Sequence, residues 1–306
     1  MAAVEQWSTI HGLLGTVIEI RVRSVDQATA EAAIEAAVDE IEALERVFTV
    51  FDEDSDLNRW RRGELEPDGV LAAGLELAAR WQARGRGAFE PGIGALVACW
   101  DRAAVADRLP SPAELGTAMA EMRRNAPDPH RPPPWNLNAI AKGFIVDLAV
   151  GQAVGLAGVL DVMVNAGGDI CHFGEDSVLV GVEDPAAPFD NAEPLVTVEV
   201  RNAAIATSGG GRRGWEIGGQ WYGHVLDPRT GQPVDHTVSA SVLAPDAATA
   251  DVVATICTVL PPPEAKTYVD ELSDECAGDV ACWIVDKDRT LHRSQRARRA
   301  EVLSAG

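Results

Sequence analysis

The sequence has few basic residues relative to its acidic ones. It contains 26 lysines and arginines against 47 aspartates and glutamates, which gives a formal net charge of −21 at pH 7. Binding to nucleic acid or to an anionic lipid surface depends on an excess of cations. The charge balance therefore argues against both classes of partner, but a small phosphorylated ligand at one local site remains open.

Long apolar runs and a signal peptide are also missing. No run approaches the ~18 apolar residues of a membrane span, and the longest candidate, Val252 to Leu260, is interrupted by threonine. The first residues, MAAVEQWSTIHG, lack the basic and apolar regions of a signal peptide. The sequence therefore predicts no membrane insertion and a cytoplasmic location.

Cysteine is scarce as well. The 5 cysteines are scattered, and no two form a C-x-x-C pair. Such a set is typical of buried free thiols rather than of a disulfide or zinc framework. A chain of 306 residues can bury a large core without such cross-links, and its length corresponds to about two domains or one large one.

The elements that are present alternate between strands and helices, which predicts an α/β or α+β fold. Residues 101–134 read as a loop-rich connector, and 286–288 as the turn of a closing hairpin. Helices are expected at 27–48, 68–84, 139–155 and 248–260. Strands are expected at 15–22, 178–182, 195–200, 221–226 and 237–243, with a strand, a glycine turn and a second strand over 159–170.

The first candidate site is a helix start in NAIAKGFIVD (138–147). Asn138 is expected to cap this helix and Lys142 to lie in its first turn. A helix N-terminus offers free N–H groups to a phosphate, and a nearby lysine adds positive charge. An ordinary helical lysine fits the pattern too, and Gly143 predicts close approach of the backbone to a ligand or to another element.

Two turns carry further polar groups. AIATSGGGRR (204–213) is interpreted as a loop after a strand, with hydroxyls at Thr207 and Ser208, but it lacks the G-K-[ST] ending of a phosphate loop. A plain glycine loop fits it equally well. In GHVLDPRTGQPV (223–234), His224 lies on a predicted strand just before a strong turn signal, where a structural or a catalytic role is open.

Asp251 and Thr255 lie four residues apart on a predicted helix and therefore share one face. A carboxylate and a hydroxyl on one face suit a hard cation such as Mg²⁺. An exposed i,i+4 pair is the alternative. The apolar residues around Asp251 predict a largely buried helix, so its charge needs a partner.

Taken in order along the chain, seven segments resemble the motifs of the FAD:protein FMN transferase family. The resemblance covers roughly residues 13–290 and implies a single flavin transferase domain over 1–306. Residues 291–306 are a basic tail, and the sequence QRARRAEVLSAG (295–306) predicts that its last part is poorly packed. It implies mixed sheets flanked by helices, in two closely joined lobes with FAD in the cleft between them. The segments are FDEDSDLNRW (51–60), GAFEPGIGALVACW (87–100), LNAIAKGFIVD (137–147), VNAGGDI (164–170), AIATSGGGRR (204–213), HVLDPRTGQPV (224–234) and ADVVATICTVL (250–260).

The activity that this resemblance implies is Mg²⁺-dependent cleavage of FAD. The FMN part would be attached through a phosphoester bond to a threonine of a target flavoprotein in an electron-transfer system. Two alternatives stay open: an FAD pyrophosphatase that releases FMN and AMP, and a non-catalytic FAD-binding protein.

The resemblance also implies roles for particular residues. His224 matches the family histidine and is expected to help activate the threonine, while Thr207 and Ser208 would shape a phosphate loop. The cation would be bound by Asp251, Thr255 and main-chain oxygen at Ala139, with Ala248 as a further candidate. The FAD site would be lined by Leu14, Phe51, Ala88, Phe89, Glu90, Asn136, Lys142 and Leu226.

Four of these positions depart from the family pattern. Leu14 replaces a methionine, Phe51 a tyrosine and Glu90 an aspartate, so the apolar, aromatic and acidic characters are kept. Asn136 replaces an aspartate and removes a charge. The departures leave Asp251, Thr255 and His224 in place and predict altered FAD affinity or an altered balance of transfer and hydrolysis.

Overall fold

The computed structural model describes residues 3–124, 133–185, 187, 192–211, 213–275 and 279–302. Its centre is an 8-stranded antiparallel sheet in the order β1-β2-β3-β4-β7-β10-β11-β12. The strands are β1 (Val4–Leu13), β2 (Thr16–Ser24), β3 (Val159–Ala166), β4 (Asp169–Gly174), β7 (Ala203–Gly209), β10 (Thr237–Ala244), β11 (Ala281–Asp286) and β12 (Leu291–Arg293).

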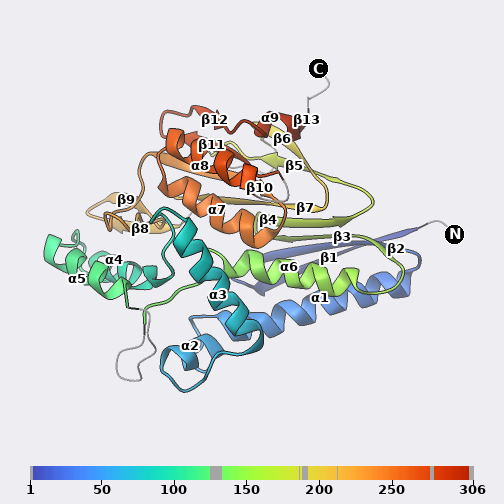
Figure 1. Ribbon diagram of the computed structural model, residues 1–306, viewed down its shortest axis with the longest axis horizontal. Helices are drawn as coiled ribbons and strands as arrows, with labels where there is room; N and C mark the ends of the chain where they lie inside the picture. Colours follow the sequence, from blue (N-terminus) through green and yellow to red (C-terminus); the bar gives the residue numbers. More distant parts are fainter. Residues whose placement is uncertain are drawn as a thin grey trace.

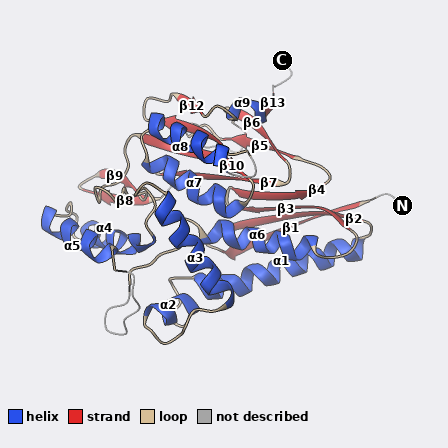
Figure 2. Ribbon diagram, in the orientation of Figure 1, coloured by secondary structure: helices blue, strands red, loops and turns tan. Residues whose placement is uncertain are grey.

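One face of this sheet is covered by helices, which Figures 1 and 2 show in front of the strands. Alternation along β2 explains the arrangement, because Ile18, Ile20 and Val22 are fully buried while the residues between them face the other side. The helices of this layer are α1 (Gln27–Phe48), α3 (Gly69–Arg84), α6 (Ala141–Val154), α7 (Ala247–Val259) and α8 (Pro262–Glu275). The mixed architecture confirms the predicted fold class.

Helix α1 has the predicted bounds. Its N-cap is Asp26, whose side chain accepts a hydrogen bond from the N–H of Thr29. Ile34, Ile41 and Phe48 recur at helical spacing and are buried in the main core. The acidic residues between them stay on the outside of the helix.

Part of the opposite face is covered by a second, 3-stranded sheet of β5 (Val178–Val182), β6 (Val196–Val200) and β13 (Glu301–Val302). The prediction of a poorly packed tail over 295–306 is therefore wrong for 295–302. After β12, helix α9 (Ala297–Ala300) buries Ala297 fully, and Glu301 accepts hydrogen bonds from Trp283 and Arg293. These contacts were not visible in a basic, low-complexity sequence, and residues 303–306 lie outside the described part.

A smaller core lies beside the main one, at the left of Figure 1. It joins α4 (Gly94–Val105), α5 (Pro112–Met122) and the hairpin of β8 (Gly214–Ile217) and β9 (Gln220–Gly223). Helix α5 corrects the prediction of a loop-rich connector over 101–134. A capping box between Ser111 and Glu114 starts this helix. Two shorter helices, α2 (Asp56–Arg61) and η1 (Pro91–Ile93), lie along the connections.

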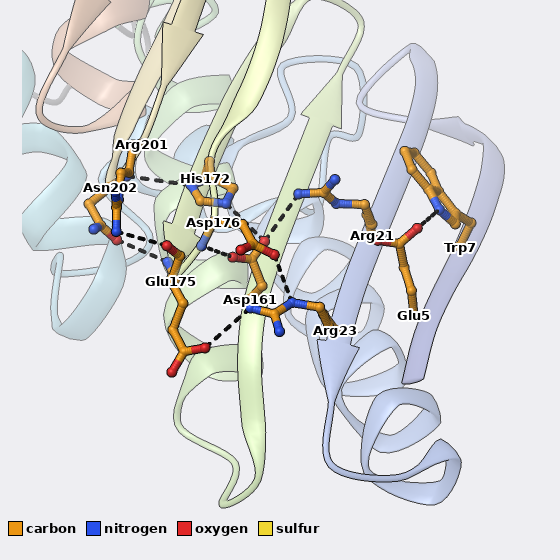
Figure 3. Close-up of polar contacts among 11 residues, drawn as sticks. Glu5, Trp7, Arg21, Arg23, Asp161, His172, Glu175, Asp176, Arg201 and Asn202 are labelled. Atoms are coloured by element: carbon orange, nitrogen blue, oxygen red, sulfur yellow. Dashed lines mark hydrogen bonds and ion pairs between the residues drawn. The ribbon is translucent and has the colours of Figure 1, made fainter. Parts of the chain in front are cut away.

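A buried polar network occupies the uncovered part of the outer sheet face, as Figure 3 shows. Asp161 on β3 is 1% exposed and lies 2.9 Å from His172 Nε2 and 3.1 Å from Arg21. It also accepts a hydrogen bond from the N–H of Asp176. The network connects β2, β3, β4 and the loop after β4, far along β3 from the glycine turn at residues 167–168.

Cys99, Cys171, Cys257 and Cys282 are buried and free, as predicted, and Cys276 lies outside the described residues. In the part of the chain that is described, no helix is long and apolar enough to cross a bilayer.

Candidate functional site

The N-terminal ends of α6 and α7 meet at Gly143, where a side chain has no room. A Cβ atom there would lie 2.2 Å from the carbonyl oxygen of Ala247. The close approach that the sequence predicted at Gly143 is thus made by another element. Asp147 fixes the junction from α6, because its carboxylate accepts the N–H groups of Ala247 at 2.7 Å and Ala248 at 2.9 Å.

This junction brings Asp251 and Lys142 into one buried group. Asp251 Oδ2 accepts a 3.1 Å hydrogen bond from the N–H of Gly143. Lys142 lies in the first turn of α6, as predicted, and its Nζ is 2.7 Å from Asp169 Oδ2. Asp169 was not among the predicted site residues, although its place directly after the glycine turn was the available signal. Asp169, Lys142 and Asp251 together are called the charge cluster below.

The electrostatics of the charge cluster follow from its burial. Burial, then the negative charge of Asp169, raises the pKa of Asp251 to about 8, and Lys142 opposes the shift. Burial also raises the pKa of Asp169, against the opposing effect of Lys142. Burial works to lower the pKa of Lys142, but the two carboxylates outweigh it and the pKa is raised. The cluster contains two carboxylates and one ammonium group, so one further positive charge would neutralise it.

The predicted cation ligands lie on α7 or just before α6. Thr255 lies one turn further along α7 and is partly buried, and the main-chain oxygen of Ala139 lies just before α6. Ala248 lies in the first turn of α7. No three acidic, histidine or cysteine side chains within the described ranges gather as a metal site. A cation here would therefore depend on hydroxyl and main-chain oxygens as well as on Asp251, which suits Mg²⁺.

Thr207 and Ser208 lie on β7 itself, which corrects the interpretation of a loop after a strand. The strand pairs with β10, and Thr207 Oγ1 is 2.7 Å from Ser241 Oγ. The main chain of Thr207 also hydrogen-bonds Asp169, which connects this strand to the charge cluster. The pairing with β10 continues to Gly209, so residues 204–209 of the predicted loop belong to the strand.

His224 follows β9 directly, because the strand ends at Gly223 and does not run on to 226 as predicted. Its Nδ1 lies 3.2 Å from the carbonyl oxygen of Arg213, so the hydrogen bond requires a proton on Nδ1 and leaves Nε2 as the acceptor. His224 is exposed at the surface, and partial desolvation of its ring, together with the charge of Arg213, lowers its pKa. The charge of Arg213 also acts on Lys142, so the loop before β8 lies close to the charge cluster.

A second group of predicted residues surrounds η1. Ala88 and Phe89 are buried, and Glu90 caps η1 by accepting the N–H of Gly92 at 3.0 Å. The N–H of Asn136 donates to Pro91, which joins the two segments. A hollow of about 290 Å³ opens beside them, bounded by residues that include Val50, Arg61, Trp135 and Asn136.

The expected cap of α6 by Asn138 is wrong. The backbone N–H of Asn138 donates to Asn136 Oδ1 at 2.9 Å, and the N-cap position is held by Ile140 without a side-chain hydrogen bond. The amide of Asn136 thus orders the turn before the helix. The first N–H groups of α6 are left without a side-chain cap at Ile140, and one of them, at Gly143, donates to Asp251.

The remaining predicted residues are dispersed. Leu14 forms the turn between β1 and β2 with a positive φ of 53°, and its N–H donates to Glu45 at 2.8 Å. Leu226 is buried in the smaller core. Phe51 is 90% exposed, so its ring is available to stack on a ligand.

The architecture is that of solved flavin transferases. The ApbE protein of Thermotoga maritima matches with a TM-score of 0.81 and 24% identity over 97% of this chain and all of that one. The flavinyl transferase ApbE of Pseudomonas stutzeri matches with a TM-score of 0.75 and 20% identity over 98% of each chain.

The sequence comparisons agree. The model of the ApbE family matches residues 14–278. The FAD:protein FMN transferase of Treponema pallidum is 30% identical over 294 residues, which cover 85% of this chain and 80% of the relative. The enzyme of the same name from Escherichia coli is 25% identical over 283 residues, 84% of this chain and 79% of the relative. The chain belongs to the ApbE family.

Proposed function

We propose that the chain cleaves FAD with Mg²⁺ and attaches the FMN part through a phosphoester bond to a threonine of a target flavoprotein. Family membership and the shared activity of the relatives make it an FAD:protein FMN transferase. The observation that supports the chemistry is the charge cluster, where the ammonium group of Lys142 lies against Asp169 and the carboxylate of Asp251 lies at the N-terminal end of α6.

The basic and the acidic residues of the cluster are proposed to bind different groups. Lys142 is the cation suited to an FAD phosphate, and its pairing with Asp169 keeps it in place. Asp251, Thr255 and the main-chain oxygen of Ala139 would hold Mg²⁺, with Ala248 as a further candidate. A bound Mg²⁺ would neutralise charge on the pyrophosphate and on the leaving AMP.

His224 is the candidate general base. Its Nδ1 proton is directed to the Arg213 carbonyl, so Nε2 can accept the proton of the threonine hydroxyl. The threonine oxygen then forms the new bond to the FMN phosphorus, and the bond from that phosphorus to the AMP oxygen breaks. The acceptor therefore gains the mass of FMN less one water, and AMP is released.

The test combines the protein, FAD, Mg²⁺ and an acceptor flavoprotein of an electron-transfer system that contains a threonine. A gain in acceptor mass of one FMN less water, lost with EDTA, is the expected result. Free FMN and AMP without acceptor gain would identify an FAD pyrophosphatase instead. FAD that stays intact would identify a binding protein. The cytoplasmic location stays a prediction, to be checked by cell fractionation.

A further inference from the structure

We infer that Asp169 is a positioning residue, which holds the ammonium group of Lys142 at the place where FAD phosphate binds. The inference rests on the proposed function, because that function places Lys142 on the phosphate. Asp169 itself does not face the ligand, since its side chain is only 2% exposed while that of Lys142 is 28% exposed. One end of the ion pair is therefore anchored inside the protein and the other opens outward.

The β3–β4 hairpin presents two acceptors to the ammonium group. Lys142 Nζ lies 2.7 Å from Asp169 Oδ2 and 3.4 Å from the carbonyl oxygen of Ala166. Ala166 and Asp169 are paired across the hairpin and are separated only by Gly167 and Gly168. Both acceptors thus belong to one short turn, and the position of the lysine follows from the position of that turn.

The turn is itself held in place. Gly167 and Gly168 have φ angles of 64° and 102°, a conformation that glycine adopts without strain. A Cβ atom on Gly167 would lie 2.1 Å from Thr16 Oγ1, so the turn packs directly against β2. The N–H of Gly168 donates to Asn165 Oδ1 at 2.9 Å. The acceptors of the lysine are thus fixed to the central sheet.

A lysine needs such a support, because its four-carbon side chain is flexible and its ammonium group has no preferred direction. Asp169 needs the lysine equally, since a buried carboxylate without a counter-ion is strongly destabilising. The two residues therefore act as a unit. Replacing Asp169 should weaken the binding of FAD by Lys142. Once Lys142 has itself been replaced, replacing Asp169 as well should weaken FAD binding no further.

The experiment is a double-mutant cycle of Asp169→Asn and Lys142→Met. FAD affinity is measured without Mg²⁺ by quenching of flavin fluorescence, and KM and kcat for transfer are measured separately. Each single variant is expected to weaken FAD binding by about 10- to 100-fold, the range for the supporting partners of a ligand-binding group. The double variant is expected to bind FAD no more weakly than Lys142→Met alone. Additive losses would overturn the inference.

Asp161→Asn is the matched control, because Asp161 is also a buried carboxylate in an ion pair, at the far end of the same strands (Figure 3). It is expected to lower the melting temperature but to leave FAD affinity unchanged. If Asp169→Asn changes FAD affinity no more than Asp161→Asn does, the role of Asp169 is merely structural. Should Asp169→Asn fail to fold, the double variant, which removes both charges, is still compared with Lys142→Met.

Failure of this inference is distinguishable from failure of the proposed function. A wild-type protein that binds FAD without transferring FMN would contradict the function, and the binding cycle would still test Asp169. A wild-type protein that transfers FMN with an additive cycle would contradict the inference alone.

Discussion

At the scale of single residues, the protonation state of His224 is the feature with the clearest kinetic consequence. The ring must be neutral to accept a proton, and partial desolvation lowers its pKa below the usual value of 6.5. As pH falls through the lowered pKa, the imidazole gains a proton and loses its function as a base. We expect kcat/KM for transfer to stay level from neutral pH down to about 6.5 and to fall below it.

The measurement is the pH profile of the wild type beside that of His224→Gln. The variant is expected to be much slower than the wild type, and its kcat/KM is expected not to show the fall at low pH. If kcat/KM falls at low pH in the same way in both proteins, a group other than His224 titrates in that pH range.

Asp251 determines the second prediction at this scale. Asp251→Asn keeps the shape of the side chain but removes the carboxylate that a divalent cation needs. We expect the Mg²⁺ concentration for half-maximal activity to rise by at least about tenfold, which is typical for changes around a metal site. Titration of activity and calorimetry with Mg²⁺ both measure the change.

Asp246→Asn is the control for Asp251→Asn. Asp246 caps the same helix and accepts the N–H of Thr249, a role that asparagine fills equally well. Unchanged Mg²⁺ dependence in Asp251→Asn would mean that the cation binds elsewhere.

At the scale of elements, the contact between α6 and α7 depends on a missing side chain. Gly143→Ala would push a methyl group against the carbonyl of Ala247 and separate the helices. Overpacking of this kind costs about 1–3 kcal/mol, and it should also displace Gly143 from Asp251. We therefore expect both a lower melting temperature and weaker activation by Mg²⁺.

Gly151→Ala is the control in the same helix. A Cβ atom at Gly151 would meet nothing within 4 Å. Alanine favours a helix over glycine by about 1 kcal/mol, so this variant is expected to be slightly more stable and fully active. If Gly143→Ala resembles it, the helix junction tolerates more room than the structure indicates.

Elements whose apolar residues recur at a regular period were predictable from the sequence, and the others were not. Periodicity placed α1 at its observed bounds. It missed β1, an edge strand of polar and apolar residues whose partly buried face becomes apparent only when it pairs with β2. It also missed α5, although the capping box at Ser111 was a readable signal.

The same limit applies to the site. Residues that match a motif, such as Lys142 and Asp251, were identified, and the structure brings these two together. Asp169 was not identified although it lies in the VNAGGDI segment, because the motif does not show the 2.7 Å contact that joins positions 142 and 169. The ligands that motif order predicts stay a prediction, and the contact that supports Lys142 became apparent only in the three-dimensional structure.

At the scale of the whole molecule, the Asp161 network connects the strands on the uncovered sheet face. Removing one partner of a buried ion pair costs about 3–5 kcal/mol, because the other charge is left without compensation. Asp161→Ala would leave Arg21 and His172 unpaired. We expect a loss of that size in the free energy of unfolding, measured by urea denaturation.

Arg62→Ala provides the comparison. The ion pair of Arg62 with Glu64 lies at the surface, where water screens the two charges and such pairs contribute little to stability. Similar losses in the two variants would mean that the network tolerates the loss of one member.

The charge cluster contains more carboxylates than ammonium groups, and this affects how the protein can be engineered. Asp251 and Asp169 repel each other inside the protein, so the site costs stability that a bound cation would restore. Selection for heat resistance in the absence of metal would therefore favour apolar replacements of Asp251, which would stabilise the fold but remove the proposed cation site. Libraries intended to yield robust and active variants should be screened with Mg²⁺ present.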